Sequence, residues 1–151
     1  MRLVGVWCLI WAAGLGLAAG AVASELLPGP VPADVVSVID GDTRDVRAHV
    51  WLGQTVAIRV RLDGIDTPEL RGRCAAERTA AEAARELVRA RIGADPVRLM
   101  EVRYGKYAGR VLARIVLEDG EDLGAILLAA GLGRPYDGGA RAPWCEELAG
   151  R

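Results

Sequence analysis

Apolar side chains recur along this chain with two periods, which together predict five strands and two helices. The alternation is clearest over residues 55–63, where one predicted face is apolar and the other carries Ala57, Arg59, Arg61 and Asp63. A period of two is typical of a strand with one buried face. Further strands are expected over residues 35–40, 43–52, 97–102 and 110–117.

Helical periodicity appears twice. A helix is predicted from about Cys74 to Ile92, with an apolar stripe at Ala80, Ala84, Leu87 and Val88. A second helix is expected over residues 121–130, ended by Gly131, and the tail over residues 134–151 is expected to be irregular with one helical turn near Cys145. Three strands, a helix, two strands and a helix suit a mainly β member of the α+β class, a five-stranded OB-type barrel. The pattern alone also allows another small α+β domain.

The N-terminal segment differs from the rest. Residues 3–23 carry no charge and end in Ala21-Val22-Ala23, a small-x-small pattern typical of signal-peptidase sites. We therefore interpret residues 1–23 as a signal peptide, although an uncharged stretch of this length also allows an uncleaved membrane anchor. The proline-rich residues 24–33 are interpreted as a linker, and residues 34–151 as one domain.

Cysteine content and charge narrow the function classes. Removal of the signal leaves Cys74 and Cys145, and a pair of cysteines in an exported chain is expected to form a disulfide; two free thiols are the alternative. The formal net charge of −1 argues against a high-affinity nucleic-acid packaging protein, which is normally basic. The single histidine, His49, is expected on the surface, which argues against a zinc site or histidine-based ribonuclease chemistry.

Three short motifs carry candidate chemistry: residues 40–43 (DGDT), residues 61–69 with Arg61 and an Asp-Thr-Pro-Glu string, and residues 106–110 (KYAGR). Each alone has a structural explanation, since Asp-Gly forms hairpin turns and Asp-Thr-Pro-Glu caps helices. Together they supply hard oxygen ligands for Ca²⁺ or Mg²⁺, arginine forks for phosphate oxygens, and a further carboxylate, Glu69, for the attacking water. This set predicts phosphodiester hydrolysis.

The motifs also resemble a known family. The strings VIDGDT (38–43), VRLDGIDTPE (60–69), KYAGRVLA (106–113) and EDLGAILLAAGLGRPY (121–136) are similar, in order and spacing, to the staphylococcal nuclease (thermonuclease) family. The resemblance implies an OB barrel with helices and a site that holds calcium through Asp42, Asp66 and the main-chain carbonyl of Thr67. It also implies that Arg61 and Arg110 contact phosphate, that Glu69 handles water, and that the products end in a 3′-phosphate.

Further roles follow from the same resemblance. Asp40 matches an acid beside the calcium ligands that is not itself a ligand. Lys106 and Tyr107 match residues that pack against the terminal nucleotide of the substrate, and Tyr136 falls near the family's tyrosine wall.

Two departures from the family pattern affect these assignments. The loop before the second arginine is one residue longer than the family's Lys-Tyr-Gly-Arg, so Arg110 is chosen over Arg103 and Arg114. The chain lacks the family's long C-terminal helix, and we expect the Cys74–Cys145 disulfide to hold the tail instead. Basic and aromatic substrate contacts are also sparser, which suggests a lower turnover.

The sequence therefore predicts a secreted or periplasmic calcium-dependent endonuclease, a hydrolase that cleaves DNA or RNA. We expect a monomer that leaves the membrane once its signal is cleaved. Two alternatives remain open: a nucleic-acid-binding OB module without activity, and a calcium-stabilised envelope protein that binds another ligand on the same barrel.

Overall fold

The predicted strands and helices are present, with bounds close to those expected, in the computed structural model, which describes residues 25–106 and 108–150. The predicted signal peptide (1–23) and Tyr107 lie outside the described residues. The elements are β1 (Leu26–Leu27), β2 (Val31–Val38), β3 (Thr43–Trp51), β4 (Gln54–Leu62), β5 (Ile65–Asp66), α1 (Ala75–Ile92), β6 (Val97–Tyr104), β7 (Arg110–Val116), α2 (Leu123–Ala129), β8 (Arg134–Pro135) and α3 (Trp144–Ala149).

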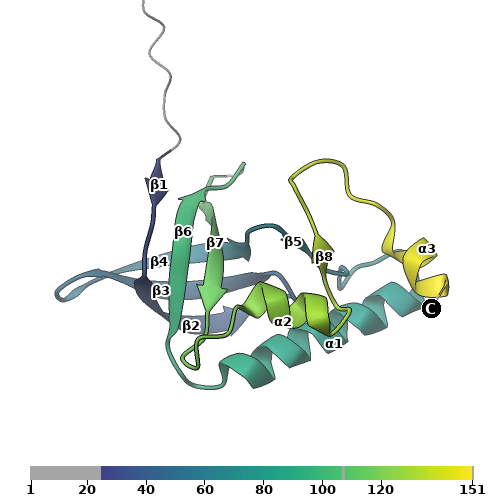
Figure 1. The fold of residues 1–151 in the computed structure, drawn as a ribbon, viewed down its shortest axis with the longest axis horizontal. Coiled ribbons are helices and arrows are strands. Elements are labelled where there is room, and N and C mark those ends of the chain that lie inside the picture. Colours follow the sequence, from purple (N-terminus) through teal and green to yellow (C-terminus); the bar gives the residue numbers. More distant parts are fainter. Residues whose placement is uncertain (1–24, 107, 151) are drawn as a thin grey trace, which may run out of the picture.

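Five of the strands close into a barrel. The antiparallel strands β2, β3 and β4 form a meander, β4 pairs with β7 in parallel, and β7 pairs with β6, which closes the barrel by pairing with β2. The two remaining pairings are short, since β1 extends β6 and β5 pairs with β8. This topology confirms the predicted mainly β, five-stranded OB-type barrel with helices (Figure 1).

The barrel begins earlier than the sequence suggested. Leu26 and Leu27 pair with β6, and residues 31–33 pair with the other end of the same strand. The interpretation of residues 24–33 as a linker is therefore wrong for Leu26–Leu27 and residues 31–33. Pro32 is the second residue of β2, and a proline is tolerated near the start of a strand, where its missing N–H is not needed by the ladder.

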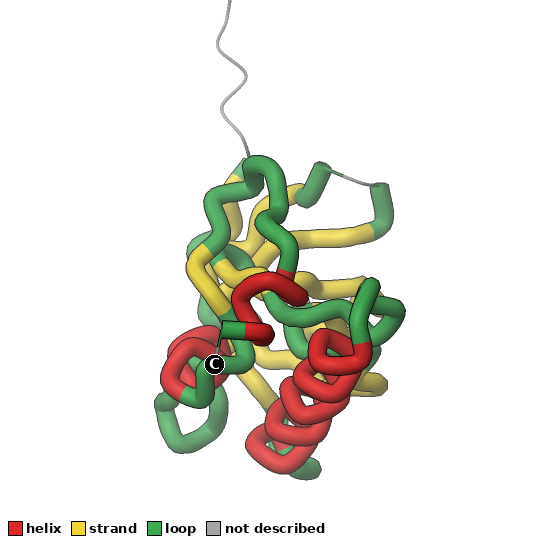
Figure 2. The backbone as a smooth tube through the Cα atoms, turned by 90° about the vertical axis from the view of Figure 1, so that its right-hand side faces the viewer, coloured by secondary structure: helices red, strands yellow, loops and turns green. Residues whose placement is uncertain are grey.

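The core lies between the barrel and the helices. Val60 and Leu62 are buried as the alternation of β4 predicts, while Val56 is half exposed because the β3–β4 hairpin extends beyond the barrel. The buried stripe of α1 includes Ala81, Ala84, Val88 and Ile92, so it is partly displaced from the predicted stripe, in which Ala80 and Leu87 are only half buried. In Figure 2 the helices face the viewer and the strands lie behind them.

The C-terminal tail returns to the start of α1. After α2, the chain pairs through β8 with β5 and then ends in α3, which lies beside α1 (Figure 1). The loops that precede and follow β5 therefore lie close to the tail. Among the residues that the structure describes, no helix combines the length and the apolar character needed to span a membrane.

Candidate functional site

The turn between β2 and β3 holds Asp42 in a fixed orientation. The Asp42 backbone N–H donates to Asp40 Oδ1 at 3.0 Å, and the Asp42 carbonyl accepts from the Leu62 N–H at 2.7 Å. Gly41 is required here, because a Cβ at this position would lie 2.9 Å from both Ala84 Cβ and Thr67 Oγ1. The Asp40 side chain therefore holds the Asp42 backbone through this hydrogen bond.

The Asp42 carboxylate is buried and strongly hydrogen-bonded. Its Oδ1 accepts from Arg61 Nη1 at 2.6 Å and from Thr43 Oγ1 at 2.8 Å. Burial raises the pKa of Asp42 to about 6, and the nearby Arg61 charge only partly offsets this effect. A carboxylate in this environment gains from any additional cation that approaches it.

Arg61 joins Asp42 to Asp66. Its Nη2 lies 3.5 Å from Asp66 Oδ1 and donates to the Ile65 carbonyl at 3.4 Å. Although it belongs to the predicted polar face of β4, the Arg61 residue is only 6% exposed. The Tyr136 ring covers it, with its centroid 6.0 Å from the guanidinium carbon. The structure thus brings together three residues that the sequence placed in two separate motifs.

Asp66 is fully buried, and residues of the tail surround it. Its Oδ2 accepts from Arg134, at 2.8 Å from Nη2 and 3.2 Å from Nε, and from Trp144 Nε1 at 3.1 Å. Its Oδ1 is 3.1 Å from Arg141 Nε in an ion pair, but within the described part of the chain it accepts no hydrogen bond. The next residue, Thr67, is also buried.

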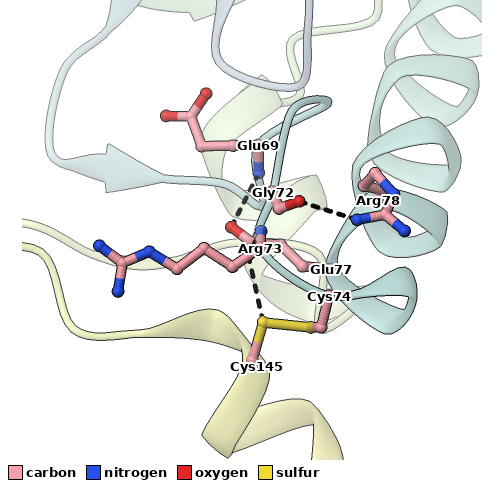
Figure 3. The surroundings of a disulfide bond; sticks show 7 residues. All are labelled: Glu69, Gly72, Arg73, Cys74, Glu77, Arg78 and Cys145. Carbon is pink, nitrogen blue, oxygen red and sulfur yellow. Dashed lines mark hydrogen bonds between the residues drawn. A yellow bond between two sulfur atoms is a disulfide. The ribbon is translucent and has the colours of Figure 1, made fainter.

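Glu69 lies at the solvent edge of this group. Its side chain is 46% exposed, and one of its carboxylate oxygens forms an ion pair with Arg141 Nη1. The Glu69 backbone belongs to a loop folded over Glu77, which accepts from the Arg73 N–H at 3.0 Å and lies 3.5 Å from the Glu69 nitrogen (Figure 3). A Cβ on Gly72 would lie 2.4 Å from Glu77 Cδ, so a larger residue at this point would require the Glu77 side chain to shift.

The predicted disulfide is present and fixes the tail against this loop. Cys74 and Cys145 are bonded across a sequence separation of 71, with their Cα atoms 6.0 Å apart (Figure 3). Cys74, Glu77 and Cys145 form a tight cluster, but the disulfide consumes both thiols, so the cluster is not a calcium site.

Arg110 lies farther along the barrel, at the start of β7. Its register partner on β4 is Arg59. The partner of Arg61 is Leu112, two residues farther along β7 than Arg110. Arg110 lines a groove of about 720 Å³ together with Arg47 and Arg59.

The other residues proposed near Arg110 are placed as follows. Arg103 pairs with Asp63, and Arg114 pairs with Asp122 and Glu101, so both alternatives are engaged elsewhere. Lys106 is exposed in the turn between β6 and β7.

Sequence reasoning missed four residues of the site: Arg44, Arg134, Arg141 and Trp144. Arg134, Arg141 and Trp144 lie in the tail that was expected to be irregular, and the pairing of β5 with β8 and the disulfide place them at Asp66. Arg44 had a usable signal, because it shares strand parity with Val46 and Ala48, which are core residues. Its Nη2 donates to the Gly41 carbonyl at 3.0 Å, and burial lowers its pKa to about 10.

The donor set fits a hard divalent cation. Asp42, from the turn between β2 and β3, and Asp66, from β5, converge on one guanidinium, and the buried Thr67 follows Asp66. Carboxylate and carbonyl oxygens are the ligands that Ca²⁺ and Mg²⁺ prefer. The buried Asp66 Oδ1, which accepts no hydrogen bond in the described chain, retains capacity for such an ion.

Comparison with known proteins supports the same assignment. Residues 59–144, more than half of the chain, match the family described as staphylococcal nuclease homologue. No curated protein sequence matches the chain significantly. The matched region contains Arg61, Asp66, Glu69, Arg110 and Tyr136. The chain belongs to the staphylococcal nuclease homologue family, a family of nuclease-type proteins that act on nucleic acid.

Proposed function

We propose that this protein is a calcium-dependent phosphodiesterase that hydrolyses DNA, RNA or both and leaves 3′-phosphate ends. The observation that carries the proposal is the convergence of Asp42 and Asp66 on Arg61, with Glu69 three residues after Asp66. These groups supply metal ligands, a charge clamp for phosphate and an acceptor for a proton from water, which are the parts that hydrolysis of a phosphodiester requires.

Each residue has a distinct role in the proposed reaction. Asp42, Asp66 and the Thr67 carbonyl would hold calcium, which when bound would supply a Lewis acid for the phosphate. Arg61, and Arg110 from the neighbouring groove, donate to the non-bridging oxygens, where negative charge grows as water adds to phosphorus. Glu69 is exposed enough to meet that water and accepts its proton. The bond from phosphorus to the 5′-oxygen then breaks, and the leaving oxygen takes a proton from solvent.

We also propose that the protein acts as a monomer outside the cytoplasm, in the periplasm or the medium. The composition of residues 1–23 supports export, and so does the Cys74–Cys145 disulfide, since such bonds persist in oxidising compartments. Mass spectrometry of the exported protein tests whether the signal is cleaved. A mature N-terminus at Ser24 is expected, and a retained N-terminal segment would contradict it.

The catalytic proposal is tested by incubating the purified protein with single-stranded DNA, and separately with RNA, in calcium, in magnesium and in EDTA. We expect cleavage in calcium, no cleavage in EDTA, and 3′-phosphate termini on the products. Glu69→Gln is expected to lose activity, whereas Glu82→Gln, which changes an exposed glutamate of α1, keeps it. Intact substrate after prolonged incubation of the folded protein would instead favour the binding module without activity.

A further inference from the structure

Arg141 occupies the space between two carboxylates of the proposed site. Its Nε lies 3.1 Å from Asp66 Oδ1, and its Nη1 pairs with Glu69 Oε1. One guanidinium therefore contacts both the predicted calcium ligand and the predicted water-handling residue, through different nitrogens. Its carbon also lies 5.9 Å from the centroid of the Tyr136 ring, which Arg61 approaches as well.

The tail holds Arg141 at this position from both sides. On one side, β8 pairs with β5, and Arg134 Nη2 donates to the Ala142 carbonyl at 2.5 Å. On the other side, Trp144 Nε1 donates to Asp66 and Cys145 is bonded to Cys74. The Arg141 side chain itself remains 39% exposed, at the edge of a pocket of about 460 Å³ that Asp66 and Glu69 also line. Arg141 is thus anchored through its backbone while its head group has room to move.

Arg141 Nε approaches Asp66 Oδ1, the same oxygen that retains capacity for a divalent cation. The guanidinium and the cation are both positively charged, so a cation bound at Asp66 weakens the ion pair between Asp66 and Arg141. The phosphate of a substrate has to lie within reach of both the cation at Asp66 and the water at Glu69. A guanidinium that contacts both carboxylates is within reach of that phosphate, and its planar fork suits two phosphate oxygens.

We propose that Arg141 is a third arginine of the catalytic site. In the metal-free protein it bridges Asp66 and Glu69, and in the presence of cation and substrate it turns to the scissile phosphate. This inference rests on the proposed nuclease function. It makes a paired prediction, because a residue with both roles opposes calcium binding in the absence of substrate and favours phosphate binding in the presence of calcium.

The first measurement is calcium affinity without substrate, by isothermal titration of the full protein and of Arg141→Gln. Loss of the competing charge is expected to tighten calcium binding about 1.5- to fivefold, the range expected for exposed ion pairs. Arg114→Gln is the matched control, since Arg114 is similarly exposed and also pairs with two carboxylates, away from the site. Unchanged or weaker calcium binding in Arg141→Gln, or no calcium binding by either protein, would overturn the inference.

The second measurement is phosphate affinity at saturating calcium, by titration with a nucleoside 3′-monophosphate, the expected product. Arg141→Gln is expected to bind it about tenfold more weakly and to lose at least as much kcat/KM on single-stranded DNA. Arg141→Lys, which keeps the charge without the fork, is expected to restore wild-type calcium affinity and part of the phosphate affinity. A purely structural role would weaken both calcium and phosphate binding, and that result would refute the proposal.

Two readouts keep this test separate from that of the proposed function. Both affinities are measured by titration, so they decide the role of Arg141 even if the protein cleaves no nucleic acid. Thermal unfolding of each variant checks its folding, and Arg141→Met replaces Arg141→Gln if the latter does not fold. If Arg141→Gln, or Arg141→Met in its place, binds the nucleoside monophosphate as tightly as wild type does, the phosphate contact is contradicted.

Discussion

Arg44 is a charged residue buried in the wall of the barrel. It is completely buried, and its Nε and Nη1 have no hydrogen-bond partner among the described residues. Burial lowers its pKa to about 10, although Asp42 and Asp40 favour its charged form. Because the desolvation of a buried charge often exceeds what its partners return, an apolar side chain of similar length is expected to stabilise the fold.

Arg44→Met is therefore expected to raise the free energy of unfolding by about 1–3 kcal/mol. Urea titration in EDTA measures this change, with Arg47→Met, on the exposed face of the same strand, as the control. A lower free energy of unfolding in Arg44→Met would show instead that Arg44 is needed to hold the turn at Gly41.

Asp42 gives the metal-free protein a pH dependence with a defined sign. Its pKa is about 6 in the fold against an ordinary value of 3.8, because burial disfavours the charged form. The protonated form is thus favoured by folding, so the contribution of this group to stability is complete below pH 3.8 and is lost as the pH rises through 6.

Asp42→Asn removes this titration. In EDTA, the difference in free energy of unfolding between Asp42→Asn and wild type is expected to shift in favour of the variant by about 2–3 kcal/mol from pH 4 to pH 7, because the wild type loses stability over this range. Chemical unfolding at the two pH values measures the difference. An identical difference between variant and wild type at both values would contradict the raised pKa.

Individual site residues were predictable where short motifs carry them. Asp42, Arg61 and Asp66 were assigned from two strings of sequence, and the fold brings their side chains together. Arg134 and Arg141 were not predictable, because single arginines in an irregular tail have no periodicity. Only the pairing of β8 with β5 and the disulfide place them at Asp66.

At the scale of elements, the tail contacts both α1 and the loop that follows β5 and holds the two together. The disulfide closes a loop with a sequence separation of 71, for which the chain-entropy model gives roughly 4 kcal/mol. Trp144 is buried beside it and lies under the Arg134 guanidinium, 4.2 Å from the ring centroid.

Cys74→Ser with Cys145→Ser is expected to lower the free energy of unfolding by roughly 4 kcal/mol and to weaken the contacts of the tail with Asp66. Thermal unfolding with and without reductant tests this expectation. Wild type is expected to lose stability when reduced, whereas the double variant responds to reductant only within error. Equal stability of reduced and oxidised wild type would show that the tail is held by Trp144 and β8 alone.

The prediction of elements succeeded where the periodicity was strong. It failed where a proline-rich composition fits both a linker and the start of a strand. The alternation in β4 and the helical spacing in α1 located both elements. The prolines of residues 28–32 suggested a linker, but Pro32 lies near the start of β2, and sequence alone does not separate a linker from a proline at the start of a strand.

For the molecule as a whole, local charge matters more than total charge. The chain has a net charge of −1, yet arginines line the groove that Arg110 shares with Arg47 and Arg59, and three more surround Asp66. A nuclease of this kind holds its substrate through a few directed contacts and does not rely on a long-range field.

The central claim is that the Asp42–Arg61–Asp66 cluster performs calcium-dependent phosphodiester hydrolysis. The most direct test compares initial rates on single-stranded DNA at saturating calcium for wild type, Arg61→Lys and Arg114→Lys. Arg61 contacts the two carboxylates of the site, whereas Arg114 pairs with Glu101 and Asp122 away from it. The account predicts that Arg61→Lys loses about 10²–10³-fold in rate while Arg114→Lys stays within about twofold of wild type. Equal rates for the two variants, or no cleavage by the wild-type protein, would contradict it.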